Sequence, residues 1–179
     1  MTGGLLGGLT GIAVVGLTYL GQRLVQLPFV PFDVFDWQVR VLPGKVISLS
    51  IDIMVKLISS LKLGPTAAVA KQAEGLIAMA QLVVAGIVFG CVLGWLSGRR
   101  GVNLPVAGAA GSLVLLAVGL VAEFSMGFPA AGPFVSILWL VIVFVGWGTV
   151  LGQAVEAVAF PAEDVGIRGR RRFLWFVGV

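Results

Sequence analysis

The stretch GLIAMAQLVVAGIVFGCVLGWLSGRR, residues 75–100, decides the fold of this chain. It carries no charged side chain between Gly75 and Gly98 and then stops at Arg99 and Arg100. Because a helix needs about 20 consecutive apolar residues to cross the hydrocarbon core of a bilayer, this run is long enough to span a membrane. Its basic end indicates the cytoplasmic side, where Lys and Arg next to spans are retained.

The composition of the whole chain agrees with a membrane location. Of the 179 residues, 59% are hydrophobic and 11% are charged, and the mean hydropathy is +1.08. A water-soluble domain of this size could not bury so much apolar surface. The net charge is +4, but its basic residues gather beside apolar runs, which favours membrane anchoring and excludes a nucleic-acid partner. The chain has no histidine, so we expect no haem ligated by histidine.

Three more uncharged runs are long enough to span, over residues 4–22, 104–122 and 134–155. Together with residues 75–98 they predict an all-α integral membrane protein with four transmembrane helices. The apolar residues 173–179 resemble the start of a fifth span, and the connections are too short to hold a separate domain. Residues 1–179 are therefore predicted to form a single membrane domain.

Residues 45–62 follow a different pattern. Polar side chains recur there at steps of three or four, which places them on one face of an amphipathic helix: Lys45, Ser48, Asp52, Lys56, Ser59 and Lys62. Burying Asp52 and Lys56 at the bilayer centre would cost about 2.5–3.5 kcal/mol each, so a helix lying in the interface is favoured over a span. The preceding residues 27–44 mix prolines, aromatics and charges, which is typical of a loop at headgroup level.

Glycines recur every four residues in several of the spans. Gly3, Gly7 and Gly11 share one helical face in the first span. The remaining predicted packing positions lie in the second and fourth spans: Gly86, Gly90, Gly94, Gly98, Gly148 and Gly152. Small residues at this spacing allow two helix backbones to approach closely, so we expect these faces to be helix contacts.

Candidate chemistry is sparse, and the sequence predicts no catalytic, cofactor-binding or metal-binding residue. Glu123 and Glu156 are the acids closest to membrane depth, where a carboxylate suggests a proton or ion site. Their positions at span ends instead favour solvated or helix-terminal residues. Cys91, the single cysteine, is expected to be a small buried residue.

The topology follows from the basic residues. With Arg170–Arg172 on the cytoplasmic side, counting backwards through the spans puts Arg99 and Arg100 inside as well. The N-terminus is then cytoplasmic, and residues 45–62 lie on the outer face. Counting residues 45–62 as a span would move the N-terminus outside.

The segment RRRFL near the C-terminus resembles a twin-arginine export signal, with Arg170, Arg171, Phe173 and Leu174 at the matching positions. Gly169 and Trp175 depart from the usual flanking residues. The alternative interpretation is a plain positive-inside cluster.

Three segments together resemble a known family: LPFVPFDVFDW (27–37), LPGKVISLSIDIMVKL (42–57) and RRRFLWF (170–176). They are similar to the N-terminal membrane part of bacterial membrane-anchored, molybdopterin-dependent oxidoreductases of the sulfite-oxidase-like type. The resemblance implies a multi-pass anchor in the bacterial inner membrane, followed by an external catalytic domain that holds the molybdopterin. The molybdenum ligand of that family is a cysteine of the catalytic domain, which Cys91 does not match.

Two other classes stay open. A small non-catalytic accessory subunit of a respiratory or photosynthetic membrane complex needs only lipid and neighbouring subunits as partners. A transporter or channel needs polar residues at mid-span depth, where this chain offers Thr10, Ser112 and Thr149. A quinone could bind among the apolar helices, but no residue indicates a site for it.

Overall fold

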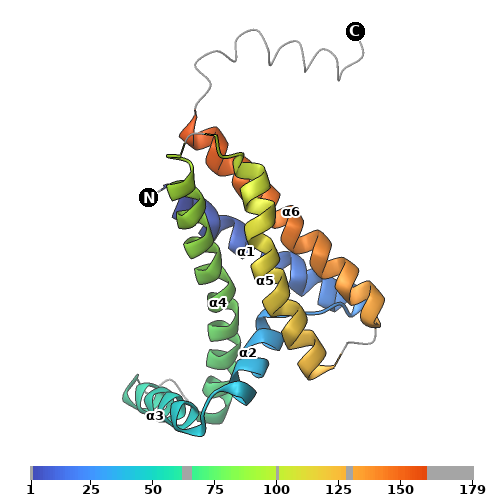
Figure 1. Ribbon diagram of the computed structural model, residues 1–179. Coiled ribbons are helices and arrows are strands. Elements are labelled where there is room, and N and C mark those ends of the chain that lie inside the picture. The colour runs from blue at the N-terminus through green and yellow to red at the C-terminus, as the bar shows by residue number, and fades with distance from the viewer. Residues whose placement is uncertain (1, 62–65, 100, 128–130, 161–179) are drawn as a thin grey trace.

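The computed structural model describes residues 2–61, 66–99, 101–127 and 131–160. Within these ranges the chain forms α-helices and no strand (Figure 1). The helices are α1 (Thr2–Val25), α2 (Val30–Val41), α3 (Gly44–Leu61), α4 (Thr66–Leu96), α5 (Leu104–Met126) and α6 (Pro133–Ala159).

Four of these helices are long and apolar enough to cross a membrane: α1, the Lys71–Leu96 part of α4, α5 and α6. The prediction of an all-α membrane fold is confirmed, and the architecture is that of a multi-pass membrane protein. The observed helices extend a few residues beyond the predicted spans. The exception is the C-terminal end of α4, which stops at Leu96, so that Gly98 lies in the following turn and not on the helix.

Residues 30–41 correct the expectation of a loop, because they form the helix α2. Pro31 occupies the first turn, where its missing N–H removes no intrahelical hydrogen bond. Asp33 in the first turn and Arg40 in the last turn match the helix dipole. The helix ends before Pro43, as expected from the steric restriction that proline places on the residue before it.

The six helices are arranged as two antiparallel pairs with two short additions. α1 packs along α4 and α5 packs along α6, and the two pairs meet mainly through α1 and α6. α2 packs against α5 and α4, and α3 packs on α4. Figure 1 shows α2 and α3 gathered at one end of the bundle, which we call the α2–α3 end. The opposite end, where α4 finishes, is called the Arg99 end.

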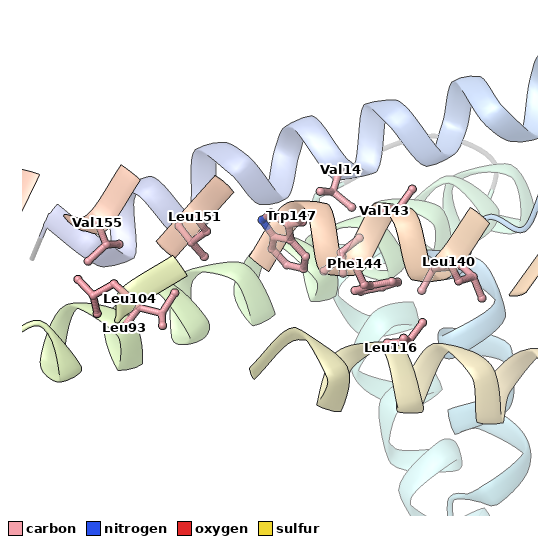
Figure 2. Packing of buried hydrophobic residues seen from close by; sticks show 12 residues of the cluster. Val14, Leu93, Leu104, Leu116, Leu140, Val143, Phe144, Trp147, Leu151 and Val155 are labelled. Atoms are coloured by element: carbon pink, nitrogen blue, oxygen red, sulfur yellow. The ribbon is translucent and has the colours of Figure 1, made fainter. Parts of the chain in front are cut away.

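The core lies along the inner side of α6. Phe144 and Trp147 are almost fully buried in its middle, and Leu140 and Leu151 extend the same row (Figure 2). Most other large apolar side chains of the spans point outward and are exposed, for example Leu9. In a water-soluble protein this would be a liability, whereas in a bilayer these side chains face lipid.

At the Arg99 end, the Arg99 guanidinium lies 3.8 Å above the ring of Trp95. Trp95 itself is exposed at the end of α4. An aromatic ring paired with a cation is typical of the membrane–water interface, where the ring meets lipid and the charge meets water.

Candidate functional site

The glycines of α1 and α4 form a contact between two helix backbones. A Cβ atom added at Gly86 would lie 2.5 Å from the carbonyl oxygen of Gly7, and one added at Gly90 would lie 2.9 Å from the Gly7 Cα. Gly3 faces Gly90 and Gly94 in the same way. Since real Cβ atoms do not approach backbone atoms so closely, any larger residue would force the helices apart.

A second glycine contact joins α5 to α6. Gly108 faces Gly148, whose added Cβ would lie 2.7 Å from the Ser112 side chain. An added Cβ at Gly152 would lie 2.8 Å from both the Leu104 carbonyl carbon and the Pro105 Cα. Both helix pairs are therefore held at a distance that only glycine permits. Gly98, in the turn after α4, faces no other helix.

Trp147 links the two pairs. Its indole Nε1–H donates a hydrogen bond of 2.9 Å to the hydroxyl of Thr10 on α1. Its ring stands edge-on to Phe89 of α4, with the centroids 6.1 Å apart. The side chain thus touches α1 and α4 from its position on α6.

The small polar residues at mid-span depth, Thr10, Ser112 and Thr149, each donate a hydrogen bond within their own helix. The hydroxyl of Ser112 donates to the Ala109 carbonyl at 2.8 Å, and that of Thr149 donates to the Val145 carbonyl at 2.8 Å. Thr10 likewise donates to the Leu6 carbonyl at 2.9 Å. These hydroxyls serve the helix backbone and do not line a polar path through the bundle.

The predicted polar face of the amphipathic helix lies on α3 and is exposed at Lys45, Ser48, Asp52 and Lys56. Ser59 is also on α3, whereas Lys62 lies outside the described residues. Apolar side chains are exposed on the same helix: Leu49, Ile51 and Ile53. α3 thus presents both a charged and an apolar face at the α2–α3 end.

Glu123 lies in the last turn of α5, as its position at a span end predicts, but it is not solvated. Its side chain is only 2% exposed and packs against α2, where its carboxyl group hydrogen-bonds with the carboxyl group of Asp33. The Oε1 atom of Glu123 and the Oδ2 atom of Asp33 are buried and accept no hydrogen bond from an N–H or hydroxyl donor of the described residues. Glu156 is exposed near the end of α6, as its position at a span end predicts.

A cavity of about 290 Å³ adjoins this pair of carboxyl groups. Gln22 and Gln26 line it from the C-terminal end of α1, and Gly127 lines it from the end of α5. Gln26 adopts a left-handed backbone conformation with φ of 56°, which costs about 1–2 kcal/mol for a residue with a Cβ. Burial raises the pKa of the Asp33 carboxyl above 3.8, and the negative charge of Asp36 raises it further. Two hydrogen bonds lower this pKa, one with Glu123 and one from the backbone N–H of Phe29.

Sequence reasoning missed this pair because it placed Asp33 in a loop. Had residues 30–41 been read as a helix, Asp33 would have fallen on its first turn, but nothing in the sequence pairs that turn with the end of α5. Cys91 is also corrected: it is exposed on the outer surface of α4, where an apolar thiol can face lipid.

The segment RRRFL, with Arg170, Arg171, Phe173 and Leu174, lies outside the described residues, as does the start of the fifth span at 173–179. No known protein family, curated protein or solved structure matches this chain. We therefore infer its function from its own residues and contacts.

Proposed function

We propose that this chain is the membrane-anchoring domain of an exported molybdopterin-dependent oxidoreductase, held in the bacterial inner membrane with its N-terminus in the cytoplasm. The observation that supports the anchoring role is that both short helices lie at the same end of the bundle. α2 and α3 both lie at one end, while direct backbone contacts hold α1 against α4 and α5 against α6. Such a bundle is suited to hold a position in the bilayer and to present a surface at one end.

The helix α3 supplies that surface. It packs on α4 and exposes Lys45, Asp52 and Lys56 on one face and large aliphatic side chains on another. A helix of this kind lies flat when its apolar face enters the interface of the bilayer and its charged face points toward water. A domain held outside the membrane would meet the charged face first.

The nature of the exported domain rests on the sequence resemblance and on the twin-arginine-like residues Arg170 and Arg171. Twin-arginine export carries folded proteins, often with a cofactor already bound, which suits a molybdopterin enzyme. The exposed pairing of Trp95 with Arg99 supports an interfacial position for the Arg99 end, and the proposed cytoplasmic side rests on the clustering of Arg99 with Arg100.

The test is the intact mass and molybdenum content of the protein purified from its native membrane. A mass far above 18.6 kDa together with bound molybdenum supports the proposal. A mass close to 18.6 kDa overturns it and leaves the accessory-subunit alternative, whose partners would then be identified by co-purification. A larger protein without molybdenum keeps the anchor and overturns the assignment of its enzyme.

A further inference from the structure

A pair of carboxyl groups is buried at the α2–α3 end without a basic partner. Glu123 comes from the last turn of α5 and Asp33 from the first turn of α2. The ion pair found among the described residues is Lys71–Glu74, which involves neither of them. Two carboxylates in hydrogen-bond contact cannot both be ionised without a compensating positive charge, because each would repel the other in a medium that screens poorly.

One buried oxygen of each carboxyl group receives no hydrogen bond from any other group in the described part of the chain. Glu123 Oε1 belongs to a side chain that is 98% buried, and neither it nor Asp33 Oδ2 accepts from an N–H or hydroxyl donor of the described residues. Both residues line the cavity of about 290 Å³. Buried oxygens without a partner are costly, so their presence together beside a cavity points to a bound positive group.

The ends of three helices meet at the cavity: the N-terminus of α2, whose partial positive charge stabilises Asp33, and the C-termini of α1 and α5, which favour a cation. The cavity lies where α1 and α5 both end, and the C-terminus of each helix carries about half a negative charge from its unpaired carbonyls. Between Val25 and Val30 the chain is not helical, and such interrupted helices bind Na⁺ or protons through backbone carbonyls in membrane transporters. The amide side chains of Gln22 and Gln26 can add neutral oxygens.

No ion pair joins another ionisable group of the described residues to Asp33 or Glu123, although the charge of Asp36 acts on Asp33. The guanidinium of Arg23 on α1 donates to the Tyr19 hydroxyl at 3.1 Å and lies over the Tyr19 ring. On α2, Asp36 lines a separate pocket with Lys71 and Glu74 of α4. Arg40 is exposed in the last turn of α2, and the acid of α6, Glu156, is near its far end.

We propose that Asp33 and Glu123, with the carbonyl ends of α1 and α5, form a binding site for one monovalent positive charge, delivered either as a proton or as Na⁺. With a proton bound, the two carboxyl groups hydrogen-bond to each other as the structure shows. When the proton leaves to solvent, Na⁺ takes its place between the two carboxylates. Loss of the proton and binding of the cation thus exchange one positive charge for another.

The test uses the full chain in detergent and measures two quantities. Thermal unfolding is followed in NaCl and in choline chloride at matched ionic strength, at neutral and at alkaline pH. Infrared spectroscopy detects the C=O stretch of a protonated carboxyl group at neutral pH. The variants are Glu123→Gln and Asp33→Asn, which keep the shape of the side chains, and the control is Glu156→Gln, since Glu156 is exposed.

We expect a protonated-carboxyl band at neutral pH that Glu123→Gln removes and Glu156→Gln leaves. We also expect NaCl to raise the melting temperature at alkaline pH, and this rise to disappear in both site variants. The band without a sodium effect identifies the proton as the ligand, and a sodium effect without the band identifies the metal ion. If the unaltered chain shows neither the protonated-carboxyl band nor the rise in melting temperature with NaCl, the proposal is overturned. This outcome is read from the unaltered chain alone and does not depend on the folding of a variant.

Discussion

Replacing Gly7 with alanine tests whether direct backbone contact holds α1 to α4. The added Cβ would meet the backbone carbonyl of Gly86, with its carbon 2.8 Å away, and the Cα of Gly90 at 3.1 Å. Backbone atoms of a packed helix cannot rotate away as a side chain can, so the helices must separate. Overpacking of this kind costs about 1–3 kcal/mol, and we expect Gly7→Ala to lower the free energy of unfolding by that amount.

The matched control is Gly16→Ala on the same helix. Gly16 is exposed, and an added Cβ has no atom within 4 Å. Alanine favours a helix over glycine by up to about 1 kcal/mol, so this variant should be neutral or slightly more stable. The assay is unfolding by SDS in mixed micelles, followed by tryptophan fluorescence. Trp147, one of five tryptophans in the chain, lies 3.1 Å from the Cβ position of Gly86 and contributes to this signal.

Gly86→Ala disturbs the same contact from the other helix. The losses of Gly7→Ala and Gly86→Ala should therefore not add in the double variant, because the first substitution already separates the backbones. Equal stability of Gly7→Ala and Gly16→Ala would refute the idea that backbone contact holds this pair.

Further predictions concern the remaining contacts, each with its own measurement. Gly108→Ala should destabilise the α5–α6 pair by about 1–3 kcal/mol in the same SDS assay. Gly146→Ala should cause no such loss, because an added Cβ there has no atom within 4 Å. Equal losses of stability in the two variants would contradict the geometry. Trp147→Phe should cost about 0.5–1.5 kcal/mol by removing the hydrogen bond to Thr10, and no further loss is expected when Thr10→Val is added. Because burial raises the pKa of Asp33, the folded chain binds protons more tightly than the unfolded chain: this stability is complete below pH 3.8 and is lost as the pH rises through the raised pKa. The melting temperature in choline buffer should therefore fall as the pH rises above 3.8, and less so in Asp33→Asn. For topology, Ser97→Cys in a Cys91→Ala background should resist labelling from outside and Ser48→Cys should accept it; the reverse pattern would invert the proposed orientation.

Cysteine labelling is the test of orientation because the number of Lys and Arg residues does not differ between the two halves of the chain. Half of the twelve Lys and Arg residues fall before α4 enters its apolar run, and the other half fall at Arg99 or beyond. Acidic residues contribute little to the positive-inside rule. The prediction of a cytoplasmic N-terminus therefore rests on how tightly the arginines cluster at 99–100 and 168–172.

The spans were predictable from the sequence because their signal is local. An uncharged run such as residues 75–98 reports its own length and hydropathy, and lipid leaves the helix as the structure that satisfies every backbone group. Periodicity also placed glycines on one face, since a spacing of four repeats along a helix regardless of what it meets. Periodicity does not predict which helix a glycine face will contact. The spacing of Gly3 and Gly7 contains no information that they pack against Gly90 and Gly86.

The contact between Asp33 and Glu123 could not be predicted from the sequence for the same reason. Asp33 and Glu123 are brought together by the docking of α2 on α5, which depends on the whole arrangement of the bundle. The prolines at 28 and 31 obscured α2 itself, because they suggest a break as readily as they suggest a first helical turn. Position at a span end then made solvent exposure the natural expectation for Glu123.

The pairing of α1 with α4 also affects how the protein is made. α5 and α6 are neighbours along the chain and can close as a hairpin soon after both enter the membrane. Gly7 and Gly86 are roughly 80 residues apart, so at roughly 5–20 residues per second the ribosome needs about 4–16 s before α1 meets its partner. During that time the glycine face of α1 is exposed to lipid or to the insertion machinery. α1 must therefore wait in the bilayer until α4 has been made. A shortened chain that ends before α4 would leave α1 without its packing partner.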